Sequence, residues 1–129
     1  MKPEDLSCSD WNYLDCIYHL SKLTNSVRPV DIANDLQVTK PSVTRAIKIL
    51  AAMGMIYKNY LGEIILTSKG VRTAQSLSNQ CKTLKDFFNE ICGGNSVPSN
   101  QDILKISYMI SNETLEAIQA YLKKKGLSY

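Results

Sequence analysis

Apolar residues recur along this chain with the spacing expected of packed α-helices. Residues 5–22 carry one apolar face, made by Leu14, Ile17, Tyr18 and Leu20. A longer face covers residues 69–92, where Ala74, Leu77, Cys81, Leu84, Phe88 and Ile91 follow at intervals of 3, 4, 3, 4 and 3. The first pattern predicts a helix. The second is typical of a coiled-coil seam, which needs a partner along its length.

Residues 29–54 predict two helices separated by a short break. The first helix has its apolar positions at Val30, Ile32, Ala33 and Leu36. The break covers Gln37 to Thr39, and a second helix begins at Lys40-Pro41, where a proline costs nothing because its amide would be unpaired anyway. The second helix buries Val43, Ala46, Ile47 and Leu50. This arrangement is a helix-turn-helix.

A β-hairpin follows. Met55 to Lys58 and Glu63 to Leu66 are short runs rich in branched and aromatic residues. Asn59 to Gly62 lies between them and ends in glycine, which accepts a positive φ freely. Two helices followed by a hairpin indicate a winged helix-turn-helix.

The second half predicts three helices. The long helix from residue 69 stops at Gly93-Gly94, and residues 95–98 connect it to a helix capped by Ser99 and Asp102, with Ile103, Ile106 and Ile110 on one face. Ser111 or Asn112 caps a final helix with Leu115, Ile118 and Leu122. The lysines at 123–125 suit the end of a helix dipole and need no nucleic-acid explanation.

The predicted fold class is therefore mainly α, with a winged helix-turn-helix in residues 1–70 and a helical dimerisation domain in residues 71–129. The helices of the second domain have narrow seams and little core of their own, which favours burial against a second copy of the chain. Packing against the first helix is the competing arrangement. The predicted dimer interface consists of Leu77, Leu84, Phe88 and Ile91. A two-fold dimer would place two recognition helices ~34 Å apart, matching a palindromic operator in double-stranded DNA.

The polar face of the second helix of the motif predicts DNA binding. Hydroxyl and cationic side chains at these positions bond phosphates and base edges, and the residues concerned are Thr39, Lys40, Ser42, Thr44, Arg45 and Lys48. Lys58, Asn59 and Tyr60 at the hairpin would rest on the phosphate backbone or enter the minor groove. The alternative, a winged-helix scaffold that binds protein, would favour apolar residues at these positions.

Charge supports the DNA interpretation. The chain has a net charge of only +3, but residues 39–72 hold six basic residues and one acid, Glu63.

No apolar run approaches the ~20 residues needed to cross a bilayer, and the acidic N-terminus lacks a secretory core, so we expect a cytoplasmic protein without membrane contacts. Four cysteines without CxxC spacing are expected to stay reduced. No catalytic motif is present, which argues against an enzyme.

These residues resemble the metal-dependent repressors of the diphtheria toxin repressor family, especially the short manganese-regulator branch that lacks the extra C-terminal domain. The resemblance covers residues 10–122, and its most specific matches are VxDIAxxLxVxxxSVT at 30–44 and LTSKG at 66–70. It implies a dimeric winged-helix repressor with a long linking helix. It also implies that Thr39, Pro41, Ser42, Thr44 and Arg45 fall at DNA-contacting positions.

The metal site of that family is degenerate in this sequence. The two acids of the first helix correspond to Asn12 and Asp15, and the histidine of the linking helix corresponds to Cys81. The ligands of the penultimate helix correspond to Leu104, Ser107 and Tyr108. Mn²⁺ requires several carboxylate and imidazole donors, so a conventional manganese site is not expected.

The regulatory input therefore stays open at the level of sequence. Control without metal is the preferred interpretation. The alternatives are a divalent, softer ion bound by Asp15, Cys81 and Asn12, with Cys8 or the lone His19 nearby, or a response to thiol oxidation or a small ligand at Cys81. Cys81 also fits the apolar seam as an ordinary packed thiol.

Overall fold

The computed structural model describes residues 6–94 and 97–127. The predicted start of the first helix at Asp5 and part of the predicted connector at residues 95–98 lie outside the described residues. The described chain divides into two compact units, one ending at Gln75 and one beginning at Ser76, within a continuous helix. In the described ranges, no helix is both long enough and apolar enough to span a bilayer.

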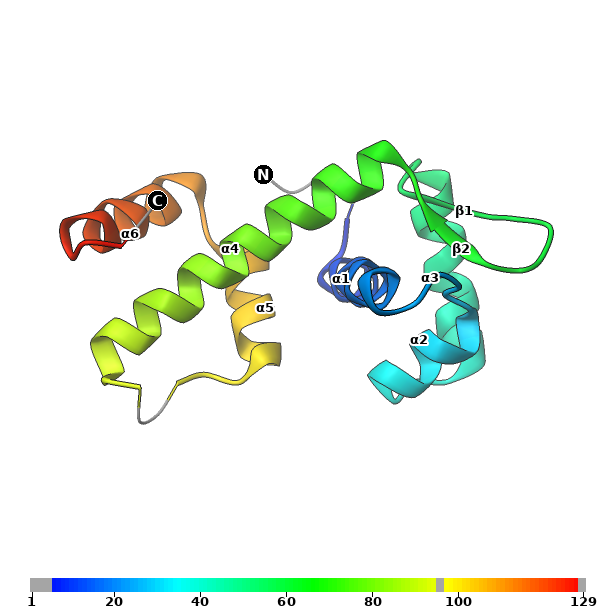
Figure 1. Cartoon of the computed structure of the whole chain (residues 1–129), viewed down its shortest axis with the longest axis horizontal. Helices are drawn as coiled ribbons and strands as arrows, with labels where there is room; N and C mark the ends of the chain where they lie inside the picture. The colour runs from blue at the N-terminus through cyan, green and yellow to red at the C-terminus, as the bar shows by residue number, and fades with distance from the viewer. Residues whose placement is uncertain (1–5, 95–96, 128–129) are drawn as a thin grey trace. The chain divides into compact units, whose positions relative to one another are not determined.

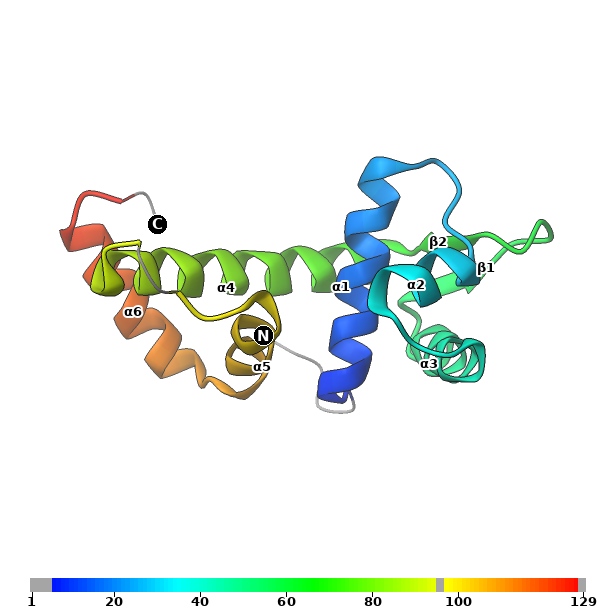
Figure 2. The same cartoon turned by 90° about the horizontal axis from the view of Figure 1, so that it is seen from below.

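The first unit is a winged helix-turn-helix, as predicted (Figure 1). Its hairpin projects beyond the two helices of the motif in both views of the chain (Figure 2). The elements in chain order are α1 (Cys8–Leu23), α2 (Pro29–Leu36), α3 (Lys40–Ala52), β1 (Ile56–Lys58), β2 (Ile64–Leu66) and the first turns of α4 (Ser68–Cys92).

Local chemistry sets the helix boundaries of this unit. The Ser7 hydroxyl accepts a hydrogen bond from the amide of Asp10 and caps α1. Gln37 ends α2 with a φ of 55°, the only positive φ at a non-glycine residue in the described chain. The Thr39 hydroxyl accepts from the amide of Ser42 and starts α3. The break between α2 and α3 thus consists of the left-handed residue Gln37, then Val38, then the N-cap Thr39.

A single core holds the three helices and the hairpin together. Every predicted apolar position of α3 is buried, which confirms the 3.6-residue pattern of that helix. Of the predicted apolar positions of α2, Ile32 and Ala33 are buried, Leu36 is half-buried and Val30 is 47% exposed. The largest fully buried side chains of this unit are Leu6, Trp11, Leu14, Ile17, Ile32, Val43, Leu50 and Met55.

The hairpin is joined closely to the start of α4. Its strands are antiparallel, with Ile56 opposite Leu66. Gly70 in the first turn of α4 packs so tightly on the backbone of Met55 that an added β-carbon would collide with the Met55 carbonyl oxygen. Lys69 donates from Nζ to the Met53 carbonyl at the end of α3 over 2.8 Å. The glycine of the LTSKG motif therefore permits a close approach of two backbones.

The second unit contains the rest of α4 with α5 (Asn100–Met109) and α6 (Asn112–Lys124). Ser99 and Ser111 cap the two shorter helices through their hydroxyl oxygens, as the sequence predicted. The Ser107 hydroxyl on α5 donates to Oε1 of Gln80 on α4 over 3.0 Å, in a buried position. The Phe87 and Tyr121 rings join α4 to α6 with centroids 5.8 Å apart.

This unit has a core of its own, although the narrow seams predict little core in these helices. Leu84, Ile103, Leu104 and Leu122 are all at most 4% exposed. Two of the four residues predicted for the dimer interface, Leu77 and Leu84, are buried within the single chain and are therefore core residues. The prediction was wrong for these two because heptad spacing indicates that a side chain is buried. It does not indicate whether the same chain or a second chain covers that side chain. Phe88 is half-buried and Ile91 is 57% exposed.

Candidate nucleic-acid interface

Helix α3 has one buried and one solvent-facing side. Val43, Ala46 and Leu50 hold its apolar side in the core. Lys40, Pro41, Thr44, Arg45 and Lys48, all predicted DNA contacts, are exposed on the remaining surface. A rigidly seated helix thus presents three cations to solvent. That arrangement is suited to phosphates and base edges.

The hydroxyl groups near the start of α3 already have intramolecular partners. The oxygens of Thr39 and Ser42 are 2.9 Å apart and share a hydrogen bond. Thr44 donates from Oγ1 to the Lys40 carbonyl over 3.0 Å. Each hydroxyl oxygen can still accept a second bond. These three residues therefore order the helix start, whereas Arg45 and Lys48 extend outward.

The hairpin residues predicted to meet DNA differ in their surroundings. Lys58 is exposed, and Tyr60 is 94% exposed. Asn59 is half-buried, and its Oδ1 accepts from the amides of Leu61 and Glu63 over 3.0 and 2.9 Å. Its Nδ2 donates to the Glu63 carboxylate over 2.9 Å. Asn59 therefore shapes the turn in which the sequence placed it, and its side chain is occupied by these bonds.

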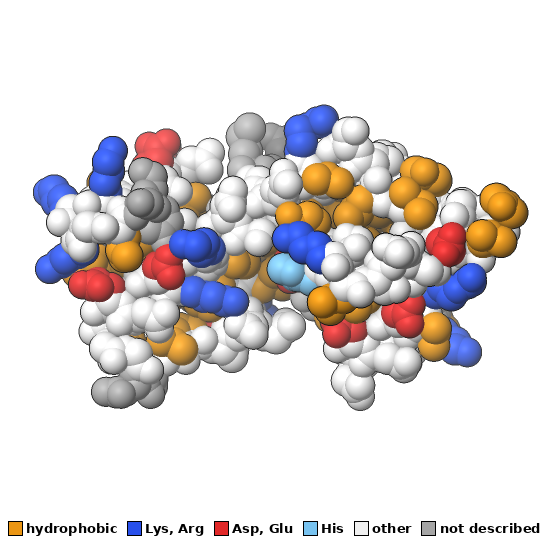
Figure 3. Space-filling model, in the orientation of Figure 1, with side chains coloured by type: hydrophobic (Ala, Val, Ile, Leu, Met, Phe, Trp, Pro, Cys, Tyr) orange, Lys and Arg blue, Asp and Glu red, His pale blue; other side chains and the backbone are white. Residues whose placement is uncertain are grey.

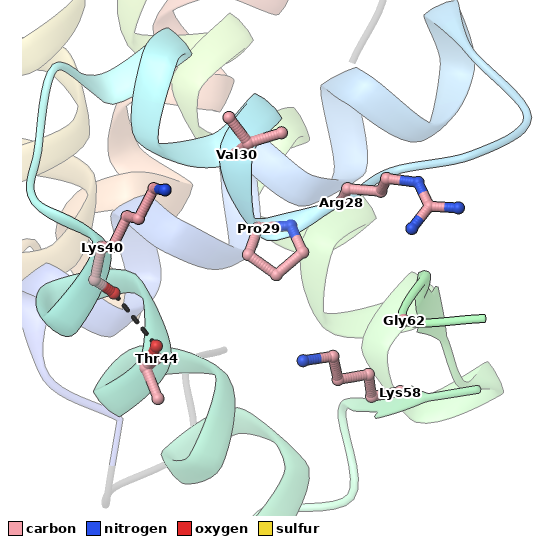
Figure 4. Close-up of a pocket in the computed structure, with 7 residues that line it drawn as sticks. All are labelled: Arg28, Pro29, Val30, Lys40, Thr44, Lys58 and Gly62. Atoms are coloured by element: carbon pink, nitrogen blue, oxygen red, sulfur yellow. Dashed lines mark hydrogen bonds between the residues drawn. The ribbon is translucent and has the colours of Figure 1, made fainter. Parts of the chain in front are cut away.

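A cavity of about 440 Å³ lies between α3, the start of α2 and the hairpin (Figure 4). Three cationic side chains from three separate segments line it, and the Lys58 ammonium points toward the space between the hairpin and the helices. No carboxylate is among its lining residues, which are Arg28, Pro29, Val30, Lys40, Thr44, Lys58 and Gly62. Its charge and its position beside the exposed side of α3 suit a phosphate group.

Arg28 is the residue of this site that sequence reasoning missed. It precedes α2, and its Nη1 donates to the Leu61 carbonyl on the hairpin over 2.8 Å. Its backbone amide donates to the Asp31 carboxylate over 2.9 Å, which fixes the start of α2. The sequence signal that could have indicated Arg28 was its position directly before a helix that begins with proline. Its contact with a residue 33 positions later was not visible in the sequence.

The one acid near the hairpin is held on the loop. Hydrogen bonds from Ser26 and Asn59 lower the pKa of Glu63, and the positive charge of Arg28 acts in the same direction. The carboxylate therefore stays ionised and engaged with its neighbours. Its negative charge partly offsets that of Arg28, whereas Lys40 and Lys58 also line the cavity.

The candidate metal ligands lie in different units. Asn12 and Asp15 are on α1, and Asp15 is 3.0 Å from Nε2 of His19. Cys81 lies on the part of α4 that belongs to the second unit. Of the residues aligned with the ligands of the penultimate helix, Leu104 and Ser107 are buried, and Ser107 is bonded to Gln80. Within residues 6–94 and 97–127, no three His, Cys, Asp or Glu side chains gather in a group able to hold a metal ion.

Cys16 neighbours these candidates but has a structural environment. Its thiol is buried and donates to the Asp35 carboxylate over 3.2 Å, joining α1 to α2. Burial raises the pKa of Cys16 well above its ordinary range, and the hydrogen bond to Asp35 raises it further. The thiol is therefore neutral and protected at physiological pH.

Comparison with known proteins agrees with this fold and site. A family described as iron dependent repressor, N-terminal DNA binding domain, matches residues 5–62. An uncharacterized HTH-type transcriptional regulator of Methanocaldococcus jannaschii is 30% identical over 92% of this chain and 96% of its own length. Transcriptional regulator MntR of Escherichia coli O157:H7 is 28% identical over 89% of this chain and 74% of its own.

Solved structures show the same fold. The metal-dependent transcriptional regulator MtsR superposes with a TM-score of 0.80 at 21% identity, covering 88% of this chain and 53% of that one. The chain thus spans about half the length of this solved regulator. The relatives are transcriptional regulators and not enzymes, which confirms the expectation from the sequence that this chain is not an enzyme. The cationic winged helix-turn-helix and a relative matched along almost its full length place this chain in the diphtheria toxin repressor and MntR family of DNA-binding, metal-dependent transcriptional repressors.

Proposed function

We propose that this chain is a homodimeric repressor that binds a palindromic operator by inserting α3 into the major groove. The observation that carries the proposal is the two-sided character of α3. Its apolar side is fully seated in the core, while Lys40, Arg45 and Lys48 face solvent. Arg45 is assigned the main base contact together with Ser42, and Lys48 and Lys58 are assigned to phosphates.

The cation-lined cavity extends this proposal to the DNA backbone. Arg28, Lys40 and Lys58 line it from three segments of one compact unit. A phosphate of the strand beside α3 fits this charge, and neutralising it would release a condensed counterion. Arg28 is thereby added to the proposed DNA contacts, while Asn59 is assigned the task of shaping the loop.

The proposal of a dimer depends on apolar side chains that the chain itself leaves uncovered. Ile91 is 57% exposed and Met109 is 76% exposed in the second unit. A largely apolar cavity of about 330 Å³ is lined by Lys105, Ile106, Met109 and Ile110. We assign the interface to Phe88, Ile91 and this face of α5. Two recognition helices would then lie about one DNA turn, ~34 Å, apart.

We further infer that the repressor is not a conventional manganese sensor. Leu104 has no donor atom, and Ser107 is buried against Gln80, so the residues at the penultimate-helix positions do not fit an ion that prefers carboxylate and imidazole. Metal-independent control is the preferred form of this proposal. A softer ion at Asp15, Cys81 and Asn12, or an oxidisable thiol at Cys81, remains the alternative. Because the partner is DNA, we place the protein in the cytoplasm.

The decisive experiment selects duplexes from a random library with the full chain and measures binding of the selected site by fluorescence anisotropy at several salt concentrations. We expect a two-fold symmetric consensus, a preference over scrambled DNA of at least about 1,000-fold, and affinity that falls steeply with salt. The Arg45→Ala variant serves as a control that keeps the fold. Absence of duplex binding at low salt would instead favour a protein-interaction scaffold.

A further inference from the structure

The tip of the hairpin, residues 59–62, is ordered by its own hydrogen bonds. The side chain of Asn59 bonds Leu61 and Glu63, as described above. The backbone adds bonds from the Asn59 amide to the Glu63 carbonyl and from the Gly62 amide to the Asn59 carbonyl, both 3.0 Å. Gly62 completes the turn with a φ of 81°. A loop with this many internal bonds loses little conformational entropy when it binds a partner.

The tip is also fastened to the start of α2. The guanidinium of Arg28 bonds the Leu61 carbonyl, and the Ile64 amide donates to the Val27 carbonyl over 2.7 Å. These two contacts connect the hairpin to the segment between α1 and α2 within one compact unit. They fix the direction of the tip relative to α3.

This ordered loop presents two large side chains to water. Tyr60 is 94% exposed and Leu61 is 51% exposed. Figure 3 shows hydrophobic side chains at the outer end of the hairpin, with Lys or Arg side chains and an Asp or Glu side chain beside them. Rigid display of an aromatic and an aliphatic group is typical of a surface that becomes covered by a partner.

The surrounding charge favours nucleic acid as that partner. Arg28 and Lys58 line the cavity that suits a phosphate, and these two cations outnumber the carboxylate bonded to the tip, that of Glu63 on Asn59. Phosphates border both sides of a minor groove about 6 Å wide, which admits a single ring or an aliphatic chain. Apolar side chains that enter this groove wedge between base steps and open them. An apolar tip in front of two cations matches that geometry.

We propose that Tyr60 and Leu61 form an apolar wedge that enters the minor groove next to the base pairs read by α3. This inference rests on the proposed function, since it assumes that α3 binds an operator. The wedge would make the protein sensitive to flanking sequence without hydrogen bonds to flanking bases, because pyrimidine–purine steps such as TA open more easily than G·C-rich ones. Tyr60 and Leu61 are then specificity-determining residues, and Asn59 and Arg28 are positioning residues.

The test uses the selected operator core with two different flanks, one containing TA steps and one G·C-rich, each carrying 2-aminopurine at the flanking position. We expect the wild-type chain to prefer the TA flank and to raise the 2-aminopurine fluorescence as the step unstacks. The double variant Tyr60→Ala with Leu61→Ala should bind the TA duplex about tenfold more weakly and the G·C duplex nearly as before. The fluorescence rise should disappear.

Two controls keep the result interpretable. Tyr57→Ala removes a 52% exposed tyrosine from β1 of the same hairpin and should leave the flank preference intact. Tyr60→Phe should keep both preference and fluorescence, because the wedge needs the ring and not the hydroxyl. The substituted tip side chains are exposed, so circular dichroism should show an unchanged helical fold.

The outcomes separate this inference from the proposed function. If the double variant binds both duplexes as the wild type does, or loses affinity equally for both, the wedge is absent although the repressor proposal stands. If the wild-type chain binds neither duplex, the proposed function itself fails. If Tyr57→Ala abolishes the preference as fully as the double variant, flank reading does not belong to the tip.

Discussion

Arg45 and Lys48 are both exposed cations of α3, but their side-chain chemistry assigns them different roles. The planar guanidinium of arginine can bond two acceptors of a guanine at once. The ammonium of lysine acts as a point charge that suits a phosphate. The two residues therefore separate sequence reading from backbone binding, and each can be tested alone.

Arg45→Ala should weaken operator binding by ~1–3 kcal/mol and relax the preference at one base pair. Arg45→Lys is the matched control, since it keeps the charge but loses the paired hydrogen bonds, and it should lose nearly as much specificity. Anisotropy titrations against operators changed at single positions provide the measurement. An equal loss on every sequence would make Arg45 a phosphate contact.

Lys48→Ala should weaken binding to all sequences alike and lower the slope of log affinity against log salt by about one. One released counterion per phosphate contact is the physical reason. Binding of specific and scrambled duplexes between low and moderate salt measures it. An unchanged slope would show that Lys48 does not contact DNA.

The Cys16 thiol should resist alkylation in the folded protein while the exposed Cys92 reacts. Burial and the carboxylate of Asp35 raise the pKa of Cys16, so the reactive thiolate is scarce at neutral pH. Peptide mapping after iodoacetamide treatment, with and without denaturant, measures this difference. Equal labelling of the two cysteines in the native protein would contradict it.

The same raised pKa predicts a pH dependence of stability. The folded state holds the Cys16 proton more tightly than the unfolded state, whose thiol titrates near the ordinary value of 9.0. The stabilisation is complete below that pH and is lost as the pH rises above it. Comparing the free energy of unfolding of wild type and Cys16→Ala from pH 7 upward isolates this contribution.

At the scale of elements, the junction between the hairpin and α4 depends on one glycine. Gly70→Ala should lower the free energy of unfolding by about 2–3 kcal/mol, because the new β-carbon would overlap the Met55 carbonyl oxygen and force the elements apart. Urea unfolding followed by circular dichroism measures the loss. Gln75→Ala, at an exposed position of the same helix, is the control and should change stability by less than about 0.5 kcal/mol. Comparable stability for the two variants would contradict the close approach.

At the scale of the whole molecule, operator binding should not require manganese. Saturating Mn²⁺ is expected to change the operator Kd by less than about fivefold, the lower end of ordinary effector coupling. The neutral, buried pair of Ser107 and Gln80 occupies one place where the family resemblance puts an acid ligand. Mobility-shift titrations after chelation, alongside elemental analysis of the purified protein, provide the test. Strong tightening by Mn²⁺ would overturn the proposal.

The elements of the fold were largely predictable because hydrophobic periodicity and capping chemistry are local. The α3 face of Val43, Ala46, Ile47 and Leu50 is buried as its spacing requires, and Ser99 and Ser111 cap the helices they precede. Gly62 adopts the positive φ that the turn demanded. Each of these features depends on residues a few positions apart, so the sequence contained the information.

Contacts between distant residues were decided only by the tertiary structure. Heptad spacing could not tell whether Leu77 and Leu84 are covered by the same chain or by another, and they are buried within the chain. The bond from Arg28 to the Leu61 carbonyl and the close approach of Gly70 to Met55 join segments that the sequence does not relate. By itself, the sequence determined the winged-helix elements and their cationic face, because these follow from short-range periodicity and charge. The folded chain decided how the hairpin tip is held and which apolar residues remain for a partner, because both depend on where distant segments meet.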